Sequence, residues 1–144
     1  MTLATKAAAA AKKKAVVGLM KERDLQRFVF DAIRMFCERG VFAFHPFNEG
    51  RRAVRSKDFY RRLGMLAGLA DVVIVFPHGR VKFMELKTET GVEGLDQIAF
   101  ARQCADSDCD YWLVRTPEEA TATLFAWGAL TENPLSHRQA GKAA

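Results

Sequence analysis

The stretch Gly68-Leu-Ala-Asp-Val-Val-Ile-Val-Phe-Pro-His-Gly-Arg-Val-Lys-Phe-Met-Glu-Leu-Lys87 predicts two β-strands joined by a tight turn. Residues 72–76 are apolar on both faces, which is typical of a strand in the interior of a sheet. Residues 77–80 have the composition of a turn. The second strand alternates, so Glu85 and Lys87 lie on one face beyond an apolar half that anchors the strand. The segment therefore predicts an antiparallel hairpin with an acid at its mouth and Glu-x-Lys at its end.

The length of the loop decides whether the acid at the mouth of the hairpin meets Glu85. A loop of two or four residues pairs Phe76 with Val81, and Asp71 then falls on the wrong face. A loop of three residues pairs Phe76 with Arg80, and Asp71 then lies opposite Glu85. We predict the odd-length loop, or a bulge that shifts the register by one residue.

Two carboxylates and an ammonium group in this arrangement suit the metal-dependent cleavage of a phosphodiester. Asp71 and Glu85 can hold a hard divalent cation through oxygen ligands. Lys87 can orient or deprotonate a water molecule and offset charge on the phosphate. Glu-x-Lys at a strand end is also the ordinary pattern of a solvated edge, and the acid at the mouth of the hairpin favours the site over that interpretation.

Two predicted helices carry further candidates for this site. Apolar residues at helical spacing predict a helix over residues 21–38, with Glu22 and Gln26 in its first turns. Glu22 is either a favourable acid near a helix N-terminus or a carboxylate that reaches into the site. Gln97 lies in the first turn of a predicted helix over residues 95–105, and it is either a surface residue or a site residue.

The segment before the hairpin is basic. Its loop and a predicted short helix over residues 59–66 could hold phosphates on both sides of a scissile bond, although each side chain alone could equally be solvated. The candidate DNA-binding residues are Asn48, Arg51, Arg52, Arg55, Lys57, Arg61 and Arg62.

The second half of the chain predicts an α/β fold. The strand ending at Lys87, the helix over residues 95–105 and a strand over residues 111–115 form a strand-helix-strand unit, which implies a right-handed crossover and a parallel pair. Thr116-Pro-Glu-Glu119 then predicts a helix start, with Thr as the N-cap and Pro at the first position.

The chain has 144 residues, which is enough for one domain with a substantial core. Its formal net charge of +5 suits a polyanionic partner. We expect a flexible basic tail over residues 1–18, a folded domain over residues 19–130 and a C-terminal tail over residues 131–144. Three scattered cysteines predict neither a zinc site nor a disulfide framework, and no apolar run approaches the length of a membrane span. Reduced thiols indicate the cytoplasm.

Taken in order, these motifs resemble those of the virus-type replication-repair nuclease (VRR-NUC) domain, a family of the PD-(D/E)xK nuclease superfamily. The resemblance covers most of the chain and rests on five motifs: Glu22 with Gln26, Asn48, Gly68-Leu-Ala-Asp71, Glu85-Leu-Lys87 and Gln97. It implies a restriction-endonuclease-like α/β core, with a mixed central sheet flanked by helices. The family often has Pro where this chain has Ala70, a change that leaves the approach to the acid less stiff.

The resemblance also implies roles for the candidate residues. Asp71 and Glu85 would ligate Mg²⁺ or Mn²⁺ with the Leu86 carbonyl, and Glu22 would act on the metal through water. Lys87 would be the lysine that activates water or stabilises charge, and Gln97 would match the family's site glutamine.

The function implied is a Mg²⁺-dependent DNA endonuclease specific for DNA structure, such as a homodimeric Holliday junction resolvase acting on branched DNA. A non-catalytic DNA-binding protein of the same fold and a sequence-specific, restriction-type endonuclease remain as alternatives. The family resemblance of the motifs also implies that the cell is a bacterium or a phage-infected host.

Overall fold

The computed structural model describes residues 20–46 and 57–140, with the side chains of Lys57 and of residues 138–140 excepted. Its elements follow one another as helices, short strands and one 3₁₀ turn. They are α2 (Glu22–Phe36), β1 (Phe42–Phe44), α3 (Lys57–Arg62), β2 (Val72–Val75), η1 (Pro77–Gly79), β3 (Val81–Leu86), α4 (Leu95–Asp106), β4 (Asp110–Val114), α5 (Pro117–Ala126) and α6 (Pro134–Ala140).

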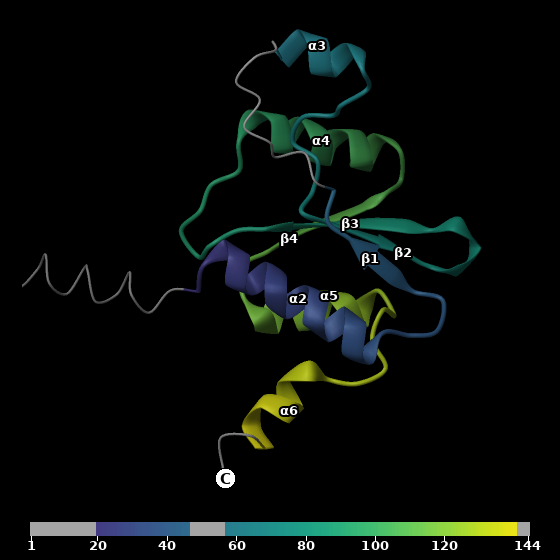
Figure 1. Cartoon of the computed structure of the whole chain (residues 1–144), viewed down its shortest axis with the longest axis vertical. Helices are drawn as coiled ribbons and strands as arrows, with labels where there is room; N and C mark the ends of the chain where they lie inside the picture. Colours follow the sequence, from purple (N-terminus) through teal and green to yellow (C-terminus); the bar gives the residue numbers. More distant parts are fainter. Residues whose placement is uncertain (1–19, 47–56, 141–144) are drawn as a thin grey trace, which may run out of the picture.

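The four strands form one mixed sheet in the order β1-β2-β3-β4. The pairs β1–β2 and β2–β3 are antiparallel, and β3–β4 is parallel. Figure 1 shows α2 and α5 below this sheet and α4 above it. The parallel pair spans α4, so the crossover unit predicted from the sequence is confirmed, as is the α/β fold with a mixed sheet and flanking helices.

The register of the hairpin is the one predicted from the odd-length loop. Val72 lies opposite Met84, and Val75 lies opposite Val81. The Phe76 N–H donates to the Arg80 carbonyl at 2.9 Å, which closes a turn of three residues. Continued by one residue beyond the pair of Val72 and Met84, the same register places Asp71 opposite Glu85.

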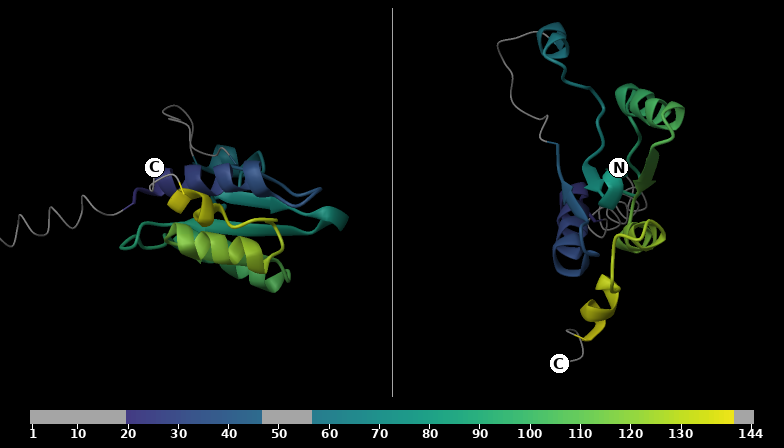
Figure 2. Two further views of the ribbon diagram at one scale, coloured as in Figure 1. Left: turned by 90° about the horizontal axis from the view of Figure 1, so that it is seen from below. Right: turned by 90° about the vertical axis from the view of Figure 1, so that its right-hand side faces the viewer.

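The lower face of the sheet carries the main hydrophobic core. Leu25, Val29 and Ile33 recur at helical spacing on α2 and pack on β2 and β3, while Leu124 of α5 closes the other half of the layer. The right-hand view of Figure 2 shows α2 and α5 side by side beneath the strands. α5 begins as predicted, because Thr116 accepts a hydrogen bond from the Glu119 N–H at 3.2 Å.

A smaller cluster holds α4 on the upper face. Phe100 and Cys104 pack over Ala70, and the rings of Phe100 and Phe83 meet edge to face with centroids 5.1 Å apart. α4 is thereby held near the beginning of β2 and the end of β3. This contact determines where the first turn of α4 lies.

Part of the segment expected to form a C-terminal tail, residues 131–144, folds as α6. The Asn133 side chain accepts from the Leu135 N–H at 2.9 Å, in the manner of an N-cap, and Pro134 occupies the first helical position. Leu135 packs against the main core, and the His137 ring stacks on Phe36 with centroids 5.0 Å apart. The Asn-Pro pair was therefore a helix start signal that we did not use.

α3 also differs slightly from the expectation of residues 59–66, since it spans Lys57–Arg62. Within the described residues, no helix is both long enough and apolar enough to cross a membrane.

Candidate functional site

Asp71 is fixed at the mouth of the hairpin by a hydrogen bond across the sheet. Its Oδ2 accepts from the Leu86 backbone N–H at 2.9 Å. His45, which follows β1, holds the other side of the same residue, because its Nδ1 lies 2.6 Å from the Asp71 carbonyl oxygen. The end of β3 and the segment after β1 therefore both position Asp71.

Glu85 is fully buried, with 0% of its surface exposed. The Lys87 ammonium lies 3.3 Å from Glu85 Oε1 and is only 13% exposed itself. The Gln97 side-chain amide donates to the same Oε1. The second oxygen, Oε2, is buried and has no hydrogen-bond partner among the described residues. A buried carboxylate oxygen without a donor is costly unless a cation or a proton satisfies it.

Charge and burial together perturb this carboxylate. Burial and the neighbouring Asp71 raise the pKa of Glu85 from 4.5 to about 7, against the lowering effect of Lys87. The charge of Glu22 raises the same pKa further, so the first turn of α2 also lies within electrostatic reach of the site. The structure therefore brings together the acids, the lysine and the glutamine predicted from the sequence.

The approach of α4 to β2 places Gln97 beside Glu85. Gln97 Oε1 accepts from the Gly94 N–H at 2.8 Å, so the side chain is oriented by the backbone of its own helix start. Gly68, with φ +73°, passes directly under this turn. A Cβ at Gly68 would contact the Asp96 carbonyl group and lie 2.6 Å from the Gln97 nitrogen. Only glycine permits this close approach.

Two side chains of β4 and its C-terminal end hold the loop that connects Lys87 to α4. The Arg115 guanidinium donates to the carbonyls of Thr88 and Gly91, each at 2.7 Å. The Tyr111 hydroxyl donates to Glu93 Oε1 at 3.1 Å. We call these contacts the loop clamp. Arg115, Tyr111 and His45 were not predicted from the sequence, because each contacts a segment at least 18 residues away and no local pattern marks such a contact.

Of the residues predicted to bind DNA, the structure describes the side chains of Arg61 and Arg62. Asn48, Arg51, Arg52 and Arg55 and the side chain of Lys57 lie outside the described residues. Arg61 and Arg62 are exposed in the last turn of α3, and Arg61 lies 3.8 Å from Asp58 of the same helix. Figures 1 and 2 show α3 apart from the sheet. The role of the seven predicted residues in DNA binding stays a prediction.

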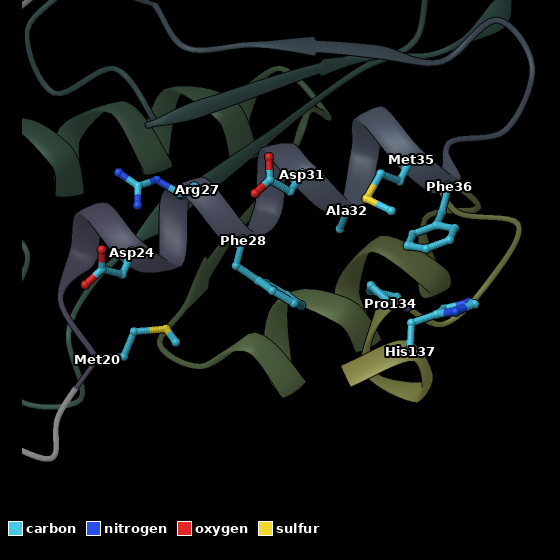
Figure 3. A pocket seen from close by; sticks show the side chains of 10 residues that line it. All are labelled: Met20, Asp24, Arg27, Phe28, Asp31, Ala32, Met35, Phe36, Pro134 and His137. Carbon is cyan, nitrogen blue, oxygen red and sulfur yellow. The ribbon is translucent and has the colours of Figure 1, made fainter. Parts of the chain in front are cut away.

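A hollow of about 390 Å³ lies between α2 and α6, away from the paired acids. Phe28 and Phe36 form its apolar wall, while Asp24 and Asp31 stand on the same helix at its rim (Figure 3). None of the predicted catalytic residues lines it.

The donor set at the hairpin mouth suits a cation that keeps much of its water. Across residues 20–46 and 57–140, no group of three or more His, Cys, Asp or Glu side chains is arranged to hold a metal. Two carboxylates, one with a buried oxygen that no described residue satisfies, fit Mg²⁺, which typically takes one or two carboxylates and retains several waters.

The fold and site thus define a class of α/β protein in which a four-stranded mixed sheet presents paired carboxylates at adjacent strand ends. A solved structure described as a VRR_NUC domain is similar to this chain, with a TM-score of 0.51 and 16% sequence identity. The match covers 73% of this chain and 94% of that one. No protein-family model matches the sequence, and no curated protein matches it significantly. The protein therefore has the fold of a VRR_NUC domain, as its motifs led us to expect.

Proposed function

We propose that the protein is a metal-dependent DNA endonuclease whose site is formed by Asp71, Glu85 and Lys87. The observation that carries this proposal is the fully buried Glu85, which shares the hairpin mouth with a second acid and has one oxygen without a donor among the described residues. Burial of such a group stabilises nothing by itself. The similarity in fold to a VRR_NUC domain supports the same conclusion.

The roles of the residues follow from their contacts. Asp71 and Glu85 would hold Mg²⁺ or Mn²⁺, together with the Leu86 carbonyl and with Glu22 acting through water. When bound, a divalent cation supplies Lewis-acid stabilisation of the charge that develops on the phosphate. Lys87, next to Glu85, would orient the attacking water and neutralise part of that charge. Gln97 would keep Glu85 Oε1 oriented, so that Oε2 stays directed at the cation.

The proposed substrate is branched DNA, such as a Holliday junction, cut by a homodimer. Two symmetric cuts in a junction need two sites related by a two-fold axis. The support for this finer proposal is the family resemblance of the sequence motifs.

The proposal is tested by incubating the protein with four-way junction, flap, single-stranded and duplex DNA, in Mg²⁺ and in chelator. We expect cleavage in Mg²⁺ and none in chelator. We expect Asp71→Asn, Glu85→Gln and Lys87→Ala each to lower the cleavage rate by about 1,000-fold or more while leaving DNA binding largely intact.

The matched control is Glu118→Gln, which removes an exposed carboxylate from the first turn of α5 and should cut at the normal rate. Normal cutting by the Asp71→Asn protein would refute the proposal. Undiminished binding of DNA with no Mg²⁺ uptake in calorimetry would instead identify a non-catalytic binder. Cleavage of unbranched plasmid at fixed sites would identify a restriction-type enzyme.

A further inference from the structure

The outer face of α2 borders a shallow groove of about 400 Å³ beside the segment that follows β1. The groove is basic and contains one aromatic ring. We call it the arginine groove, and its lining residues are Arg23, Gln26, Arg27, Phe30, Arg34 and His45.

The spacing of the three arginines aligns them along one side of the helix. Arg27 and Arg34 follow Arg23 by four and eleven residues, so all three project within a narrow sector of a helix with 3.6 residues per turn. The row spans about 16 Å at a rise of 1.5 Å per residue. A row of this length can contact several successive phosphates of one nucleic-acid strand.

Among the described residues, those that line the arginine groove include three arginines and no acid. Asp24 and Asp31 line the hollow between α2 and α6, and Arg27 borders both the hollow and the groove (Figure 3). Arg34 pairs with Asp31 at 2.5 Å, and both side chains are more than half exposed, so the pair is weak and a phosphate can replace Asp31 at little cost.

One wall of the groove contacts the segment that carries the paired acids. At this wall, the His45 ring is bonded to the backbone carbonyl of Asp71. The groove therefore borders the backbone of one of the two paired acids.

We propose that the arginine groove binds the phosphodiester backbone of DNA and guides one strand to the paired carboxylates. This inference rests on the proposed function for the identity of the ligand. Arginine provides planar donors matched to phosphate oxygens, and Phe30 offers a surface against which a sugar or base can lie. The groove supplies the attraction for DNA that the acidic site lacks before a cation binds.

The experiment measures binding of a duplex and a four-way junction to the full chain in chelator, over a series of salt concentrations. Arg23→Gln combined with Arg27→Gln should weaken binding about tenfold or more. The slope of log affinity against log salt should become shallower by about two, one for each arginine that no longer neutralises a phosphate. Arg23→Lys combined with Arg27→Lys keeps both charges and should retain most of the affinity.

The matched control is Arg39→Gln combined with Arg80→Gln, which removes the same charge at the opposite end of the sheet. Gly40 lies against the turn there, since a Cβ on it would be 3.0 Å from Pro77. Both control arginines are exposed, as are Arg23 and Arg27, so each variant should unfold at the wild-type temperature.

The outcomes separate this inference from the proposed function. An equal weakening in both variant pairs, or none in the groove pair, overturns the groove, because binding would then follow total charge. Weakening confined to the groove pair supports it, even if the wild type never cuts DNA in Mg²⁺. Cleavage by the wild type with an unchanged KM in the groove pair would sustain the nuclease and overturn the groove.

Discussion

Met84, Glu85 and Leu86 are consecutive residues of β3, and all three are 0% exposed. Their side chains nevertheless lie in different environments on the two faces of the strand. Met84 and Leu86 enter the main core between the sheet and the helices α2 and α5. Glu85 points to the other face, where only Oε1 has hydrogen-bond partners among the described residues. The lower face gains stability from burial, whereas the upper face holds a group whose burial opposes folding. The proposed cation site would give this second arrangement a function.

The largest effect on stability should come from the lower face. Leu86→Ala removes a fully buried side chain from the main core and leaves a cavity, so the free energy of unfolding should fall by about 2–5 kcal/mol. Denaturant unfolding measures it. The control is Leu95→Ala, at a leucine that is 86% exposed, which should change stability by less than about 0.5 kcal/mol. Equal destabilisation by the two substitutions would mean that Leu86 is not packed in the core as described.

The next effect concerns the upper face and depends on pH. The folded protein raises the pKa of Glu85 from 4.5 to about 7, so between these values the folded state holds a proton that the unfolded state has released. In chelator, stability should therefore fall as pH rises from about 5 to about 7 and stay low above that, by a total of roughly 3 kcal/mol. Glu85→Gln should lack this component and be more stable than the wild type at pH 8.

Mg²⁺ provides the complementary measurement. A cation that binds the carboxylate form should raise the unfolding temperature of the wild type more at pH 8 than at pH 6, and should not affect Glu85→Gln in this way. A wild type with the same pH dependence as Glu85→Gln would show that the buried carboxylate does not oppose folding.

How far the sequence predicts this molecule differs between the two faces. Local signals predicted the strands of the hairpin, the turn between them and the Thr116 cap, because alternation, turn composition and capping each act within a few residues. The odd length of the loop was predicted because it lets Asp71 lie opposite Glu85. The proximity of Asp71 to Glu85 followed from register alone. Contacts between a side chain and a segment far away in the sequence were not predicted, because no local pattern marks them. Arg115 reaches back to Thr88 and Gly91 only after the fold has formed.

The arginine groove is a different kind of omission. The helix was predicted, and the spacing of Arg23, Arg27 and Arg34 along it was visible in the sequence. What the sequence did not contain is the far wall, which His45 forms after β1. The prediction of DNA-binding residues named a basic loop and the short helix after it, and it stays a prediction beside the arginine groove.

On the upper face of the sheet, the backbone at Gly68 lies against the first turn of α4, and Gly68→Ala should disrupt this contact. The new methyl group would collide with the first turn of α4 and displace Gln97 from Glu85, because the neighbouring atoms are backbone and cannot rotate away. We expect stability to fall by about 1–3 kcal/mol, together with slower cleavage. The control is Gly64→Ala, which has a similar φ of +83° but, in the described part of the chain, no atom within 4 Å of its Cβ. Equal destabilisation of both variants would reduce the effect to backbone strain.

The smallest expected effect comes from the loop clamp, and it tests whether these contacts order the loop between Lys87 and α4. Burial and the nearby acids Glu85 and Glu93 raise the pKa of Tyr111, so its hydroxyl remains a donor over the whole working range. Tyr111→Phe should lower stability by only about 1 kcal/mol but increase hydrogen exchange in residues 88–94. Glu93→Gln in the same background should add little further, since both changes remove the same hydrogen bond. Additive destabilisation would mean that the hydrogen bond does not hold the loop, and unchanged exchange would mean that Arg115 alone fixes the path from Lys87 to α4.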